Sequence, residues 1–82
     1  MRYSEILSKR IISLCRTRGI TLNHLATMSG LRQSSVDNII RGVSRNPQIN
    51  TLHKIAIAFN MTLSEFLDFP ELNEYQPEDN NE

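Results

Sequence analysis

The sequence contains one cysteine, three glycines, no tryptophan and no long hydrophobic run. Cys15 alone excludes a disulfide within the chain, and no cluster of cysteines and histidines indicates a zinc site. The longest apolar run covers residues 55–59, whereas a membrane-spanning helix needs roughly 18 residues. We therefore expect a cytoplasmic protein that does not contact membranes and is stabilised by hydrophobic packing, with Cys15 as an unreactive core thiol.

The residue sets that carry catalysis are also missing. The sequence has no Ser/His/Asp set, no paired carboxylates at a useful spacing and no glycine-rich phosphate loop. His24 and His53 are isolated, and we expect both on the surface. An enzyme is not expected, and the sequence indicates no cofactor, metal or small-molecule ligand.

The 82 residues carry a net charge of zero that hides a separation along the chain. Residues 1–64 hold all nine lysines and arginines and two acids, a net charge of +7. Residues 65–82 hold seven acids and no basic residue, a net charge of −7. Charged runs are often only solvated surface, but a basic body also suits a polyanionic partner such as nucleic acid.

Helix-capping residues and apolar spacing predict an all-α fold of five short helices, because no stretch alternates with the period of a strand. Ser4 and Thr21 are expected to cap the first two helices, which end at Gly19 and Gly30. The third helix should cover residues 33–40 and end at Gly42, and residues 43–48 should form a loop.

The fourth helix is expected at about residues 49–59, with Asn60 as its left-handed terminator. A capping box formed by Thr62 and Glu65 then starts a fifth helix, which Pro70 should stop. We expect a domain at residues 1–69 and an acidic tail at 70–82, mobile at least beyond residue 75 because its last residues offer no apolar area to bury.

Residues 21–42 carry the strongest indication of function. Ala26 is small enough for two helices to approach, Gly30 permits the positive φ of a tight turn, and Leu31 fills that turn. Val36 and Ile39 then hold the following helix against the preceding one. This pattern is typical of a helix-turn-helix, whose second helix enters the major groove of DNA.

The chain resembles the Xre/Cro family of phage-repressor-like helix-turn-helix domains over roughly residues 6–68. The matching positions are Arg10, Ile11, Leu14, Gly19, Ile20, Thr21, Leu25, Ala26, Gly30, Leu31, Ile39, Gly42, Pro47, Thr51, Leu52, Ile55, Ala56 and residues 63–67. The resemblance implies a five-helix DNA-binding domain of a transcriptional regulator.

The polar side chains of the third helix are the candidates for contact with bases. Gln33 and Asn38 can bond bidentately to adenine, and Arg41 can bind guanine or a phosphate. Ser34 lies in one stripe with Asn38 and Arg41, and the resemblance favours Gln33, Ser34 and Asn38 as base readers. The expected contacts with the DNA backbone are Thr21, Asn23, Arg32, Ser35, Arg45 and Asn46.

The sequence departs from the family pattern in two ways. Cys15 and Ile40 stand where relatives often have an arginine and a glutamate, so we expect an apolar contact in place of an ion pair. Arg32 stands where relatives commonly have a Ser or Thr cap, which leaves the start of the third helix less firmly fixed. Asp37 is repelled by phosphates, and it either pairs with Arg41, which we favour, or accepts from cytosine N4.

The sequence thus predicts a sequence-specific regulator that binds double-stranded DNA, with a palindromic operator and a homodimer as partners. The alternative is a protein-interaction module, such as an antitoxin or anti-repressor, that uses the same fold. Residues 66–75, with Leu67, Phe69 and Leu72, would then be its docking surface, or else the seal of a homodimer.

Overall fold

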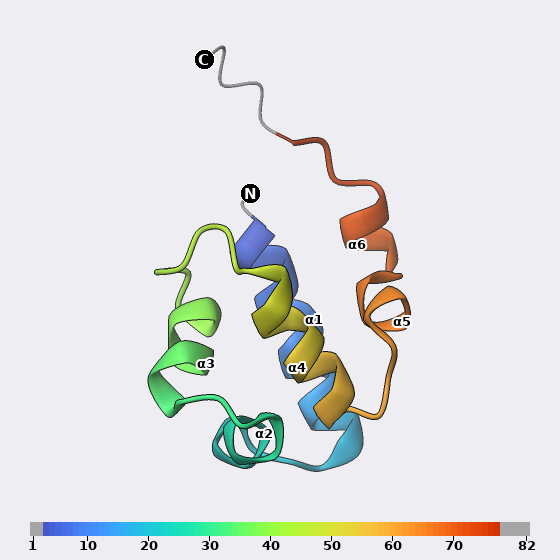
Figure 1. Cartoon of the computed structure of the whole chain (residues 1–82). Coiled ribbons are helices and arrows are strands. Elements are labelled where there is room, and N and C mark those ends of the chain that lie inside the picture. The colour runs from blue at the N-terminus through green and yellow to red at the C-terminus, as the bar shows by residue number, and fades with distance from the viewer. Residues whose placement is uncertain (1–2, 78–82) are drawn as a thin grey trace.

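The computed structural model describes residues 3–77, which form helices and connecting segments without a strand. The helices are α1 (Tyr3–Arg18), α2 (Leu22–Ser29), α3 (Gln33–Ile40), α4 (Ile49–Ala58), α5 (Leu63–Leu67) and α6 (Pro70–Asn73). In Figure 1, α1 and α4 occupy the middle of the view, with α3 on one side and α5 and α6 on the other. The all-α prediction is confirmed, with one short helix more than expected.

One hydrophobic core joins the helices. It is formed by the inward positions of α1, α2, α4 and α5 together with one residue of α3, the residue after α4 and the residue before α6. Its buried members are Ile6, Leu7, Ile11, Cys15, Leu25, Ile39, Leu52, Ile55, Ala56, Phe59, Phe66 and Phe69. Cys15 is only 5% exposed, and this burial raises the pKa of its thiol above the ordinary value, which favours the neutral form.

Local capping sets the limits of the helices, largely as the sequence predicts. The Thr21 hydroxyl accepts a hydrogen bond from the His24 amide at 3.0 Å at the start of α2. At the start of α5, Thr62 and Glu65 form the predicted capping box. Asn60 adopts a positive φ of 60° after α4, as expected of a left-handed terminator. The loop predicted at residues 43–48 contains no helix or strand.

The prediction that Ser4 caps the first helix is wrong. Ser4 lies inside α1 and is completely buried, and its hydroxyl has no hydrogen-bond partner in the described part of the chain. The helix already includes Tyr3, whose ring packs edge to face against the Tyr75 ring with 4.7 Å between centroids. This contact joins the start of α1 to a segment far away in the sequence.

The fifth helix ends at Leu67, before Pro70, as predicted, but the chain then forms a further helix that the sequence analysis did not predict. Pro70 is the first residue of α6, where a missing amide proton costs no hydrogen bond. Helix α6 packs against α1, so the chain continues as ordered structure into the segment expected to be a tail. The division at residue 69 stays a prediction, and the mobility expected for residues 78–82 concerns a part of the chain outside the described residues.

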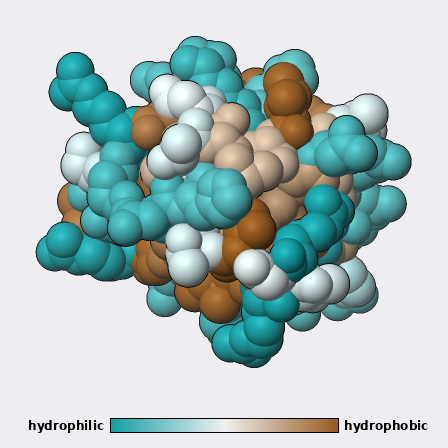
Figure 2. Space-filling model, turned by 90° about the horizontal axis from the view of Figure 1, so that it is seen from below, coloured by the Kyte–Doolittle hydropathy of each residue, from teal (hydrophilic) through white to brown (hydrophobic). Residues whose placement is uncertain are grey.

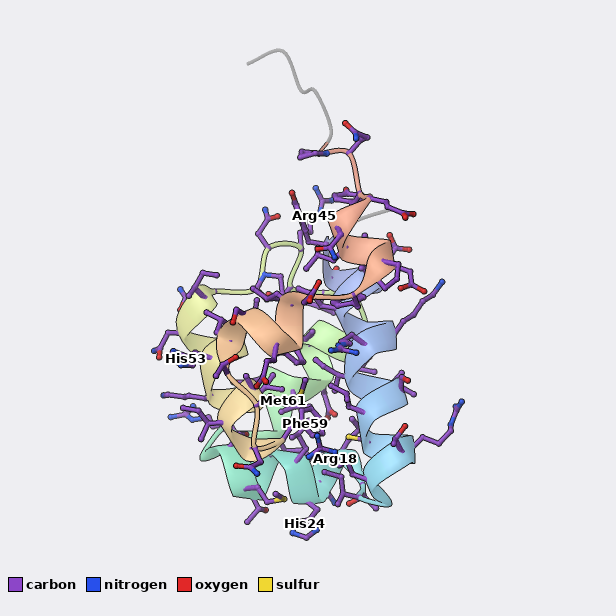
Figure 3. All side chains as sticks on the ribbon, turned by 90° about the vertical axis from the view of Figure 1, so that its right-hand side faces the viewer. Arg18, His24, Arg45, His53, Phe59 and Met61 are labelled. Atoms are coloured by element: carbon purple, nitrogen blue, oxygen red, sulfur yellow. The ribbon has the colours of Figure 1, made fainter. Side chains whose placement is uncertain are left out.

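Two arginines connect the ends of helices that lie far apart in the sequence. The Arg10 Nε donates to the Phe66 carbonyl at 3.0 Å, and its Nη2 donates to the Glu65 carbonyl at 3.1 Å. The Arg18 Nη1 donates to the Phe59 carbonyl, with its guanidinium 5.8 Å from the Phe59 ring centroid. Figure 3 shows Arg18 and Phe59 close together near the lower end of the molecule. Both arginines therefore donate to carbonyls at the ends of α4 and α5, among which the Glu65 carbonyl also accepts from the Asp68 amide.

The geometry of Arg10 predicts a loss of stability in Arg10→Ala. The variant loses two charged hydrogen bonds and a cation–π contact, in which the guanidinium lies 4.9 Å from the Phe69 ring centroid. We expect the free energy of unfolding in urea to fall by about 2–3 kcal/mol. The matched control is Lys9→Ala, which removes the same charge from an exposed position and should change stability by less than about 0.5 kcal/mol. Equal stabilities of the two variants would contradict this role of Arg10.

Candidate nucleic-acid interface

The turn between α2 and α3 has the geometry that the sequence predicts. Gly30 adopts a φ of +73°, which allows the Leu31 amide to donate back to the Ala26 carbonyl at 3.0 Å. Leu25 and Ala26 are buried on α2, and Val36 and Ile39 are buried on α3. The inner faces of the two helices are therefore apolar, and the turn fixes how α3 lies against α2.

The outer face of α3 is polar. Gln33, Ser34, Asn38 and Arg41 are all exposed, whereas Val36 and Ile39, on the opposite side of the same helix, are 0% and 2% exposed. Burial of the apolar side thus turns the four predicted base-contacting residues outward together. Their contact with bases stays a prediction.

The residues expected to contact the DNA backbone flank α3 at both ends. Thr21, Asn23 and Arg32 lie before it and are exposed, and so are Arg45 and Asn46 after it. The Thr21 oxygen already accepts from the His24 amide, so its hydroxyl proton is what remains for a phosphate. Arg32 stands at the N-cap of α3 and makes no side-chain capping bond, as its departure from the family pattern predicts.

Ser35, Asn38 and Asn46, from the predicted set, meet along one shallow depression. This depression lies between α3 and the segment that leads into α4, and Ile39 and Pro47 form its apolar part. The remaining lining residues are Ser44, Gln48 and Thr51. The sequence analysis missed these three, because a polar residue in a loop or at the start of a helix gives no signal of what lies beside it.

Asp37 does not form the expected ion pair with Arg41. Its Oδ1 instead accepts a hydrogen bond from Gln33 Nε2 at 3.3 Å, and no salt bridge between Asp37 and Arg41 is present within the described residues. Asp37 lies one helical turn from both Gln33 and Arg41, and its side-chain conformation brings Oδ1 within reach of the Gln33 amide. The Arg41 guanidinium is therefore not held by Asp37.

The apolar contact expected between Cys15 and Ile40 in place of an ion pair stays a prediction. Cys15 is buried in the core, and Ile40 packs against that core from the end of α3. The Ser8 hydroxyl adds a hydrogen bond to the Ile40 carbonyl at 3.2 Å. The packing of Ile40 against the core and one neutral hydrogen bond thus hold the end of α3 in place.

The arginines at α3 lie apart from the acids of α5 and α6, although Lys9 and Arg10 lie beside those acids. Arg32, Arg41 and Arg45 are exposed on or beside α3, and Glu65, Glu71 and other acids lie on α5 and α6. Figure 1 shows these two groups of elements on opposite sides of α1 and α4. Because Arg10 and Arg18 are engaged by carbonyls, the basic side depends on fewer residues than the sequence total indicates.

The histidines are exposed, as predicted, and lie apart from each other. His24 lies at one end of the molecule, Arg45 lies at the opposite end, and His53 is on another side (Figure 3). No group of three or more potential metal ligands occurs among residues 3–77. No helix in that part of the chain is long and apolar enough to cross a membrane.

Residues 66–75, considered above as a docking surface, contribute to the chain's own core. Phe66 and Phe69 are 0% and 7% exposed, and Leu67 and Leu72 are half-buried. Figure 2 shows hydrophobic areas among hydrophilic side chains on the face seen from below. Exposed large apolar side chains also occur outside this segment. Ile57 is 63% exposed and Met28 is 46% exposed.

Comparison with known proteins agrees with this geometry. Residues 10–77 match the family described as the Cro/C1-type HTH DNA-binding domain. The chain is 40% identical over 60 residues to the HTH-type transcriptional regulator SlrR of Bacillus subtilis (strain 168), a match that covers 72% of this chain and 40% of that protein. The chain thus spans about two fifths of the length of this curated relative.

A solved structure extends the comparison to the whole fold. The crystal structure of the prophage Lp1 protein 11 superposes with a TM-score of 0.81 at 33% identity. The match covers 92% of this chain and all of the other. With the turn after α2, the buried inner side of α3 and a family match over residues 10–77, the chain belongs to the Cro/C1-type HTH DNA-binding domain family.

Proposed function

We propose that this DNA-binding domain acts in a transcriptional regulator that recognises a specific sequence in double-stranded DNA. Helix α3 would lie in the major groove, with Gln33, Ser34, Asn38 and Arg41 at the base edges. Thr21, Asn23, Arg32, Ser35, Arg45 and Asn46 would contact the sugar-phosphate backbone. The proposed activity is binding, with no chemical step.

The outer face of α3 is the observation that carries this proposal. It presents two carboxamides, a hydroxyl and a guanidinium from one short helix, with the apolar residues of that helix turned away. Carboxamides and guanidinium groups are the side chains that form bidentate bonds with purines in the major groove. Exposed arginines before and after the helix add the charge that phosphate contacts require.

We further propose that the protein binds as a homodimer to a palindromic operator. Helix α3 has eight residues, so one copy reaches only a few base pairs. Two copies related by a two-fold axis place their recognition helices in successive major grooves about 10 base pairs apart. Two copies bury twice as much protein surface against DNA as one, which brings the buried area into the range of specific protein–DNA complexes.

Selection of bound duplexes from a random pool tests the proposal directly. The expected result is an enriched palindrome with half-sites about one helical turn apart, and gel-shift affinity for it that falls steeply with salt. Sedimentation of the complex should give two protein chains per duplex. A pool without enrichment, or a protein indifferent to DNA that retains a protein partner, would favour the interaction-module alternative.

The carboxamides of Gln33 and Asn38 lead us to expect that single substitutions change the base preference of DNA binding. Gln33→Ala and Asn38→Ala should each relax the preference at particular base pairs, with a cost of about 1–3 kcal/mol there, because each loses a bidentate bond. Binding to non-specific duplexes should change little. Gel-shift titration against single-base operator variants gives these values, and an unchanged preference at every position in both variants would exclude this orientation of α3.

We expect a different effect on DNA affinity from a substitution of Arg45, because its exposed side chain in the loop after α3 is suited to contact with a phosphate. Arg45→Ala should weaken binding to all duplexes alike and reduce the slope of log affinity against log salt by about one unit per site. Lys9→Ala, which removes the same charge beside α6, is the matched control and should leave the slope nearly unchanged. A loss confined to one base pair would contradict a phosphate contact.

A further inference from the structure

The hydrogen bond between Gln33 and Asp37 lies within the proposed DNA-contacting surface. Gln33 and Asp37 are one helical turn apart on α3, and Gln33 Nε2 donates to Asp37 Oδ1 at 3.3 Å. Asp37 is half-buried and is the one acid of this helix. A carboxylate here repels the phosphates of every duplex, so general affinity for DNA does not account for it.

The bond restricts what the Gln33 amide can offer to a base. A primary amide has two N–H donors and one carbonyl acceptor. When one N–H is donated to Asp37, the other N–H and the carbonyl oxygen form a single donor–acceptor pair. Adenine presents the complementary pair in the major groove, an N7 acceptor beside an N6 amino donor.

Guanine presents two acceptors, N7 and O6, at the same positions. A Gln33 amide that has already given one N–H to Asp37 can satisfy only one of them. The other guanine acceptor then faces the amide oxygen or the carboxylate, and such a contact between acceptors is repulsive. An amide free of Asp37 can rotate about its last bond and donate to guanine as well.

We propose that Asp37 is a positioning residue that holds the Gln33 amide in one orientation, so that Gln33 selects adenine and rejects guanine. This inference rests on the proposed function and adds the base specificity of one position. Because the amide is oriented before binding, the complex with adenine also loses less side-chain freedom.

The test compares the wild type with Asp37→Ala, Asp37→Asn and the double variant Gln33→Ala/Asp37→Ala. The base pair read by Gln33 is defined as the one whose preference disappears in Gln33→Ala. Affinities are then measured by gel shift for two duplexes that differ only there, with adenine or guanine on the contacted strand. Glu71→Ala is the matched control, since it also removes one carboxylate, from an exposed position on α6 outside the proposed DNA-contacting surface.

The wild type should prefer adenine by roughly 5- to 150-fold, the range of a bidentate contact. Asp37→Ala should reduce this ratio to less than about 3-fold, since a freed amide loses most of that discrimination. Asp37→Asn keeps an acceptor for the Gln33 amide without the charge, so it should retain the preference and bind all duplexes more tightly. In the Gln33→Ala background, Asp37→Ala should tighten binding to both duplexes alike without changing their ratio, and Glu71→Ala should leave the ratio of the wild type unchanged.

Several results would overturn the inference. An unchanged ratio in Asp37→Ala, with tighter binding to every duplex, would show that Asp37 acts through charge alone. A wild-type preference for guanine, no base pair that depends on Gln33, or no rescue by Asp37→Asn would each exclude the positioning role. Equal binding of the wild type to all sequences would instead contradict the proposed function itself. Thermal unfolding checks that the variants fold, which we expect because alanine favours a helix more than aspartate.

Discussion

The burial of the inner side of α3 is the constraint on which the proposed interface depends. A chain of this length forms one small core, so a helix that contributes Val36 and Ile39 to the interior has no freedom to turn its other side elsewhere. The turn at Gly30 and the hydrogen bond from Ser8 to the Ile40 carbonyl fix the two ends of the helix on the same scaffold. The core residues make no contact with DNA in this arrangement, and they act by orienting the residues that would.

Local rules predicted most of the fold from the sequence. Thr21, Asn60 and the capping box of Thr62 and Glu65 are determined by neighbours within a few residues, and the structure has each as expected. Local rules did not predict the burial of Ser4, helix α6 or the hydrogen bonds from Arg10 to the carbonyls of α5. Their positions depend on contacts across more than fifty residues, and an arginine or serine in a sequence does not indicate whether its partner is water or a distant carbonyl.

The candidate site shows the same division. Helical periodicity was sufficient to predict which side chains of α3 are exposed, because it follows from where the apolar residues fall. Which polar groups bond to one another was not predictable. Asp37 has Gln33 and Arg41 at equivalent spacing on either side, and charge favours Arg41. The structure has the neutral amide as partner, since side-chain conformation decides between two neighbours at the same distance along a helix.

The arginines at α3 and the acids on α5 and α6 give the described part of the chain an uneven distribution of charge, while the whole sequence has no net charge. The attraction between a dipole and a charged rod decreases faster with distance than that of a net cation, and physiological salt screens it beyond about 8 Å. Long-range capture by DNA should therefore be weak. Within a screening length, however, the field exerts a torque that turns α3 toward the duplex and α5 and α6 away from it. In this molecule, charge acts mainly on the orientation of encounters rather than on their frequency.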